Sequence, residues 1–151
     1  MKQLFLLPFT FLILMACGGG ESSSASSAPE AKKDDGKGIG EITNVTLNSP
    51  LNPTMVQKGE DIYEMKCAAC HKVTNQRVVG PGFSQITTKR KPEWIMNMIT
   101  NVEVMLAEDE AAQALLRECL VRMPNQNLSI GDARDVLEWL YANDGYEVGT
   151  E

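Results

Sequence analysis

Beyond Thr54, apolar residues recur at three- and four-residue steps, which is the spacing of one helical face. The pattern predicts four helices: from Thr54 to about Cys67, from Pro92 to about Val102, from about Asp109 to Val121, and from Ser129 to about Asn143. Two of them begin with capping-box pairs, Thr54 with Gln57 and Ser129 with Asp132. A long irregular segment, 71–91, joins the first two helices. We therefore expect an all-α domain of about four helices, whose thin core needs a large apolar group to fill it.

The N-terminal part of the chain carries a different pattern. Lys2 precedes an apolar run, Leu4 to Ala16, which is too short to cross a bilayer and typical of an export signal. Leu14-Met15-Ala16-Cys17 resembles a bacterial lipoprotein box, in which Cys17 is lipidated; the alternative is an ordinary signal with an incidental cysteine. Residues 17–53 are rich in Gly, Ser, Ala, Pro and charge, which favours a flexible linker. The predicted organisation is a signal over 1–16, a lipid-attached linker over 17–53, a domain over 54–146 and a tail over 147–151.

Composition narrows the function classes. Acidic residues outnumber basic ones by 20 to 14, so the net charge of -6 argues against nucleic acid as the partner. The only histidine is His71, which excludes histidine-rich zinc sites and haem held by two histidines. Four cysteines, at 17, 67, 70 and 119, give no disulfide framework.

The candidate chemistry lies in Cys67-Ala68-Ala69-Cys70-His71, which is C-x-x-C-H, the attachment motif of c-type haem. Two thiols add to the vinyl groups of the haem, and the adjacent histidine ligates the iron. Covalent attachment suits an exported protein, since haem lost outside the cytoplasm cannot be recovered. A thioredoxin-like pair needs a βαβ setting, and a zinc site lacks a second ligand pair. A disulfide between Cys67 and Cys70 leaves the thin core unexplained.

These residues resemble the class I c-type cytochromes. Gly59-x-x-x-Tyr63-x-x-x-Cys67 is similar to the first helix of that family, and Val136 and Trp139 match its packing partners on the last helix. Gly80-Pro81 is similar to the loop whose proline carbonyl accepts a hydrogen bond from the proximal histidine, and the resemblance therefore implies this role for Pro81. The resemblance covers about residues 54–146, and only the stretch 102–121 is long for the family.

The second axial ligand must be a methionine if the iron is six-coordinate. The candidates outside the signal and the first helix are Met96, Met98, Met105 and Met123. Met98 fits core packing, and Met105 follows a poorly defined stretch. Met123 precedes Pro124, which stops a helix and holds an extended loop, and Met-Pro ahead of the last helix matches the family's distal-ligand loop. Met123 is the predicted ligand, with Met105 as the alternative.

Four further features have structural interpretations. Cys119 fits a buried small hydrophobic residue. Lys89-Arg90-Lys91 and Glu108-Asp109-Glu110 fit solvated runs, with docking to a redox partner as the alternative. Trp94 fits either the haem edge or the core.

The resemblance implies a monohaem electron carrier that cycles between Fe(III) and Fe(II) without turning over a substrate. Its expected cofactors are one covalent haem c and iron, and its expected place is the periplasmic side of a bacterial membrane. The implied partners are a quinol-oxidising complex upstream and a terminal oxidase or a nitrogen-oxide reductase downstream. A haem-based sensor, or a haem subunit of a larger respiratory complex, remains the alternative.

Overall fold

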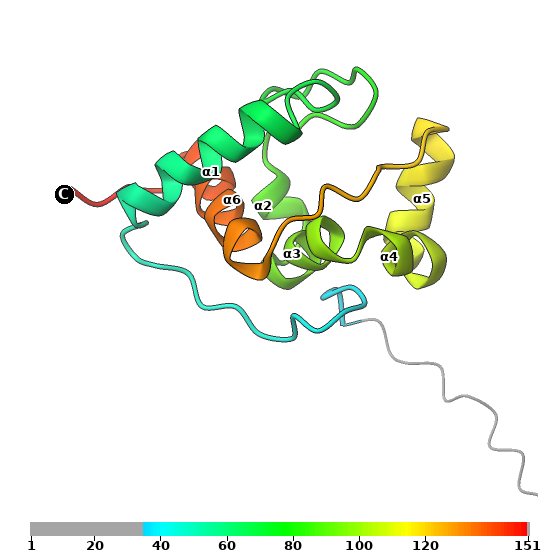
Figure 1. Cartoon of the computed structure of the whole chain (residues 1–151), viewed down its shortest axis with the longest axis horizontal. Coiled ribbons are helices and arrows are strands. Elements are labelled where there is room, and N and C mark those ends of the chain that lie inside the picture. Colours follow the sequence, from blue (N-terminus) through cyan, green and yellow to red (C-terminus); the bar gives the residue numbers. More distant parts are fainter. Residues whose placement is uncertain (1–34, 151) are drawn as a thin grey trace, which may run out of the picture. The chain divides into compact units, whose positions relative to one another are not determined.

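A computed structural model describes residues 35–150 of the chain (Figure 1). Within that range the chain forms six helices: α1 (Pro53–Lys66), α2 (Ile86–Lys89), α3 (Pro92–Thr100), α4 (Val102–Glu108), α5 (Glu110–Cys119) and α6 (Ile130–Asn143). The same residues contain no strand beyond two isolated bridges, Leu51 with Val148 and His71 with Arg77. The all-α prediction is confirmed, and the four predicted helices correspond to α1, α3, α5 and α6. None of the six is long and apolar enough to cross a bilayer.

Helices α1 and α6 pack closely against each other, as the resemblance implies. A Cβ at residue 59 would collide with the Asp135 carbonyl oxygen, so Gly59 lets the two backbones approach. One turn later the Tyr63 ring stacks on Trp139, with ring centroids 4.2 Å apart. This crossing fixes the end of α1, where the cysteine motif begins.

The caps of these two helices differ in how well they were predicted. Ser129 and Asp132 form the predicted capping box at the start of α6. The predicted box at Thr54 and Gln57 is wrong, because Asn52 caps α1 and accepts a hydrogen bond from the Met55 amide at 3.1 Å. Pro53 takes the first helical position, where a missing N–H costs nothing.

Two helices were not predicted. Helix α2 has only four residues, too few for a periodic pattern. Helix α4 follows α3 after the single residue Asn101, and its buried Val102, Met105 and Leu106 extend the apolar stripe of α3. The pattern therefore runs across the break between the two helices.

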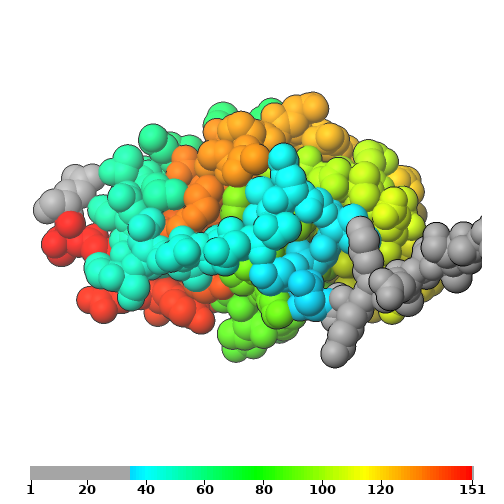
Figure 2. Space-filling model, turned by 90° about the horizontal axis from the view of Figure 1, so that it is seen from below, coloured from blue at the N-terminus to red at the C-terminus, as the bar shows by residue number. Residues whose placement is uncertain are grey.

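The segment 35–52, here called the strap, lies extended across the helices (Figure 2). Ile42 and Leu51 are buried in the core, and the amide of buried Asn97 on α3 binds the strap backbone at three points. Its side-chain nitrogen donates to the carbonyls of Lys37 and Ile42, and its oxygen accepts from the Ile42 amide. The folded domain thus begins earlier than predicted, and the expected flexible linker is wrong for residues 35–52. Residues 1–34, including Cys17, lie outside the described part of the chain.

A buried carboxylate on α6 holds the other end of the strap. Glu138 is fully buried, accepts from the amides of Asn48 and Asn52, and pairs with Arg134 at 2.6 Å. A buried charge is tolerated only with such partners. Leu51 also bonds to the main chain of Glu147 and Gly149, so residues of the predicted tail belong to the domain.

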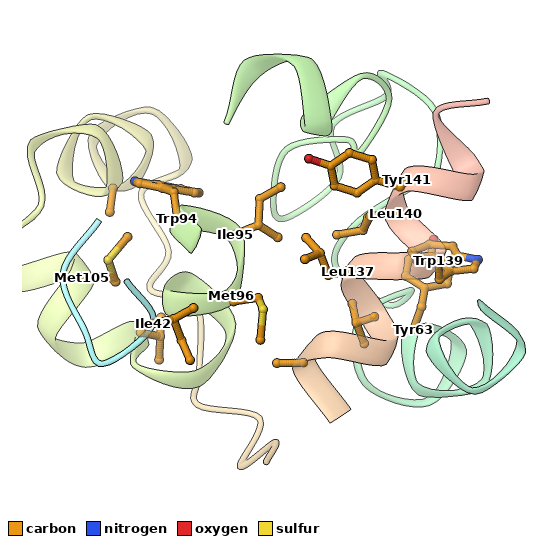
Figure 3. Close-up of a cluster of buried hydrophobic side chains, with 14 of the residues drawn as sticks. Ile42, Tyr63, Trp94, Ile95, Met96, Met105, Leu137, Trp139, Leu140 and Tyr141 are labelled. Carbon is orange, nitrogen blue, oxygen red and sulfur yellow. The ribbon is translucent and has the colours of Figure 1, made fainter. Parts of the chain in front are cut away.

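The buried core is assembled from the strap and five helices, α1 and α3 to α6. Figure 3 shows Ile42, Met105 and Trp94 in one part of the cluster, and Leu137, Leu140 and Trp139 of α6 near Tyr63 in the other. All these side chains are buried.

Candidate functional site

An apolar cavity of about 420 Å³ lies beside this core. It is lined by residues from all six helices and from the irregular segments 67–83 and 121–128. The residues predicted to carry the chemistry meet there: Cys67, Cys70, His71, Pro81 and Met123. Its size is within the range of sites that enclose small organic molecules.

The cysteine motif reaches the cavity because α1 ends just before it. Cys67 is the C-cap, and its carbonyl accepts from the amides of Cys70 and His71 at 3.0 and 2.9 Å. This tight turn brings Cys67, Cys70 and His71 close together in the chain fold, and all three line the cavity. The Tyr63 hydroxyl donates to the His71 carbonyl at 2.8 Å and ties the turn to α1. The sequence marked Tyr63 only as a packing residue, and no pattern there signals the hydrogen bond.

The orientation of His71 is fixed on three sides. Its Nδ1 lies 2.8 Å from the Pro81 carbonyl oxygen, so Nδ1 carries the proton and Nε2 keeps its lone pair for a metal. A Cβ at residue 80 would collide with the ring, so Gly80 is needed there. Phe83 stacks on the imidazole, with centroids 4.5 Å apart and planes 15° from parallel. Sequence analysis missed Phe83, because its spacing from His71 matches no pattern.

The surroundings of Cys67 and His71 set the protonation states of these two side chains. Burial, with a smaller contribution from Cys70, raises the pKa of the Cys67 thiol to about 11. Burial also lowers the pKa of His71, partly offset by the hydrogen bond to Pro81. The imidazole is therefore neutral at pH 7, the form that binds metal, whereas a protonated thiol is unlike the activated cysteines of redox enzymes.

The methionine candidates separate into two groups. Met98 and Met123 line the cavity. Met105 is fully buried elsewhere, where its Sδ accepts from the Ile39 amide of the strap at 3.0 Å, so the alternative ligand Met105 is wrong. Met96 is buried without lining the cavity. Met123 lies on the extended segment between α5 and α6, as predicted.

The remaining features have local roles. Cys119 is half-buried and lines the cavity, and Trp94 both lines it and is buried in the core. Trp94 also donates to Asp109, the N-cap of α5, at 3.0 Å, which gives the acidic run a structural role.

The basic run is engaged within the molecule. Lys89 and Lys91 bond to the carbonyls of Ser84 and Asp35, and Arg90 lies 4.7 Å from the Trp94 ring centre.

The residues present fit a covalently attached haem. The cavity lining is mostly apolar, and it includes two cysteines and a neutral imidazole whose ring orientation is fixed. The described residues contain no cluster of three or more His, Cys, Asp or Glu side chains suited to a metal ion.

Comparison with known proteins also supports a site for covalently attached haem. The family model of cytochrome c matches residues 56–143. A cytochrome c from Rhodothermus marinus is 30% identical with a TM-score of 0.67, covering 70% of this chain and 90% of that one.

Two further solved structures are similar. An engineered Rhodothermus marinus cytochrome c bound to a carbene intermediate is 28% identical over 70% of this chain and 90% of its own, with a TM-score of 0.63. A cytochrome c domain from Pseudomonas putida is 26% identical over 56% of this chain and 85% of its own, with a TM-score of 0.50. Curated protein sequences gave no match. The chain belongs to the cytochrome c family, a family of electron carriers, and its cofactor is covalently bound haem c with its iron.

Proposed function

We propose that this protein is a one-electron carrier of a respiratory chain, with His71 and Met123 as the axial ligands. The observation that supports this most directly is that Cys67, Cys70, His71 and Met123 all line the same apolar cavity. The haem supplies the one-electron Fe(III)/Fe(II) couple. Compared with ligation by two histidines, ligation by histidine and methionine favours the reduced state and raises the midpoint potential of the haem.

Each residue has a distinct part in this proposal. Cys67 and Cys70 hold the cofactor through thioether bonds, and His71 is the proximal ligand. The Pro81 carbonyl fixes the imidazole and raises its basicity toward the metal. Because two protein ligands complete the coordination, we infer that the protein turns over no substrate.

We further propose export and lipid anchoring through Cys17, on the periplasmic side of a bacterial membrane. The 17 residues between Cys17 and Asp35 reach at most about 60 Å. The proposed donor is a quinol-oxidising complex, and the proposed acceptor is a terminal oxidase or a nitrogen-oxide reductase. Changing Cys17 to Ser tests the anchor: the holoprotein leaves the membrane fraction with its haem spectrum intact, whereas retention after a salt wash contradicts anchoring.

A reduced-minus-oxidised spectrum, a pyridine haemochrome assay and carbon monoxide binding test the carrier function together. We expect one covalent haem per chain, reversible one-electron reduction, and no carbon monoxide binding to the reduced protein. Ready binding of carbon monoxide would instead favour a haem-based sensor.

A further inference from the structure

Three carboxylates are buried in the described part of the chain, and one of them has no cation beside it. Glu93, Asp109 and Glu138 are each at most 6% exposed. Glu138 pairs with Arg134 at 2.6 Å, and Glu93 lies 3.6 Å from the Lys37 ammonium. Asp109 forms no ion pair with any residue that the structure describes. Its negative charge is therefore buried without the compensation that the other two carboxylates receive.

Two N–H groups hold the Asp109 carboxylate in place. The indole N–H of Trp94 donates to Asp109 Oδ1 at 3.0 Å, and the amide of Ala112 donates to the same oxygen at 2.8 Å. The second bond is the N-cap of α5, and the N-terminal end of a helix also attracts negative charge. The carboxylate is thereby fixed between α3, which carries Trp94, and the start of α5.

Capping alone does not account for a charged residue at this position. Asparagine and serine cap helices about as well as aspartate, and each has an oxygen that can accept two hydrogen bonds. A neutral cap would therefore satisfy Trp94 and Ala112 without the free-energy cost of a buried charge. The neighbouring Glu108 and Glu110 are exposed, so this cost falls on Asp109 and not on them. A role that depends on the charge itself explains aspartate better than capping does.

The charge of Asp109 lies one side chain away from the cofactor site. Trp94 lines the cavity and is bonded to Asp109 through its indole nitrogen, which Figure 3 shows at the end of the ring away from α6. Because Asp109 is 5% exposed, water and salt screen its charge only weakly. Arg90 lies over the Trp94 ring, 4.7 Å from its centre, but is only half-buried, so its screened charge offsets a part of this field. The net field at the cofactor is negative.

We propose that Asp109, held by Trp94, lowers the midpoint potential of the haem by stabilising Fe(III), which carries one more positive charge than Fe(II). The inference rests on the proposed carrier function, because it concerns the one-electron couple of that function. It assigns to the acidic run a residue that acts on this couple although it does not line the cavity. Methionine ligation favours Fe(II) and Asp109 favours Fe(III), so the two together set the potential at which the protein exchanges electrons.

Asp109→Asn removes the charge and keeps the shape. The side-chain oxygen of asparagine still accepts from Trp94 and Ala112, and asparagine caps as well as aspartate. A redox titration of the holoprotein should show the equilibrium shifted toward Fe(II) about three- to tenfold, where tenfold is a rise in midpoint potential of about 59 mV. The melting temperature should not fall. An unchanged potential would overturn the proposal. Asp109→Ser, the other neutral cap, should shift the potential in the same direction.

Asp109→Glu is the complementary variant, because it keeps the charge but is not a favoured N-cap. It should lower the melting temperature and leave the Fe(II)/Fe(III) equilibrium within about twofold of the wild type. If Asp109→Glu raises the potential as far as Asp109→Asn does, the hydrogen-bond geometry and not the charge is responsible, and the proposal is wrong.

Glu110→Gln is the matched control, since it removes the same charge from the adjacent, exposed residue. Its shift in potential should be smaller than that of Asp109→Asn and should disappear as the salt concentration rises, whereas the effect of the buried charge should persist. Equal shifts for the two variants at high salt would overturn the role of Asp109 and leave the carrier function intact. A wild-type protein without a reversible one-electron couple would contradict the carrier function, and the proposal with it.

Discussion

Two helix-free segments of this protein differ in what holds them. The attachment loop, residues 67–83, carries a dense motif, and its main contacts are local: the Cys67 carbonyl with His71, and His71 with Pro81. The strap, residues 35–52, carries no motif and is held by remote polar side chains, Asn97 and Glu138 above all. A segment without secondary structure can therefore be as well fixed as a helix, and local sequence reveals this only when the contacts are local.

The largest expected effect comes from breaking the attachment loop. Cys67→Ala or Cys70→Ala should abolish most of the holoprotein, because the cofactor fills the cavity as well as binding there. Haem content per chain by the pyridine haemochrome assay measures this. Cys119→Ala is the control, since Cys119 lines the same cavity and should leave attachment intact. Full covalent haem in the double variant of Cys67 and Cys70 would refute attachment through these residues.

A third irregular segment covers residues 120–129. Its structure is less predictable from the sequence than that of the attachment loop and more predictable than that of the strap. It carries one chemistry-bearing side chain, Met123, without a dense motif. Met123→Ala should remove the weak long-wavelength absorption band of thioether-ligated ferric haem and admit carbon monoxide. The equilibrium should shift toward Fe(III) more than tenfold, a fall in midpoint potential of more than about 59 mV, because a soft thioether favours Fe(II).

Met98→Leu is the matched control for Met123, because Met98 also lines the cavity and leucine keeps its apolar volume. It should leave the band and the potential unchanged. Exchanged results would make Met98 the ligand and leave the carrier function intact.

Removing the contacts that hold the strap should lower the stability of the fold and leave the chemistry of the cofactor unchanged. Asn97→Leu leaves the Lys37 and Ile42 backbone groups without their buried partner and should cost about 2 kcal/mol of unfolding free energy. Denaturant unfolding of the holoprotein measures the loss, and the haem spectrum should not change. Thr100→Leu, at a half-buried position of the same helix whose hydroxyl bonds only within α3, is the comparison. Equal stability losses would show that the strap bonds contribute little.

These contrasts explain how much the sequence could predict. The four main helices followed from apolar periodicity, and the attachment motif from its residue types and spacing. The strap did not follow, because its anchors have the residue types of surface positions although they are buried: Asn97, Glu138, and Glu93, which accepts a hydrogen bond from the Val45 amide at 3.3 Å. Likewise, the sequence favoured Met123 over Met105 but could not exclude Met105, because its exclusion depends on tertiary packing that places its sulfur against the strap.

The smallest expected effect lies inside the attachment loop, at a residue that no motif marks. Phe83 stacks almost parallel on His71, so the negative face of its ring lies against the imidazole. An imidazole on Fe(III) carries more positive charge than one on Fe(II), and the aromatic face therefore favours the oxidised state. Phe83→Leu keeps an apolar side chain but removes this attraction, so the midpoint potential should rise, by less than the roughly 59 mV that corresponds to a tenfold change. Tyr146→Leu, which removes an aromatic ring packed edge-to-face against Tyr141 and not against His71, should leave the potential unchanged. An unchanged or lower potential in Phe83→Leu would mean that the ring only fills space, and that the attachment loop tunes the cofactor through His71 and Pro81 alone.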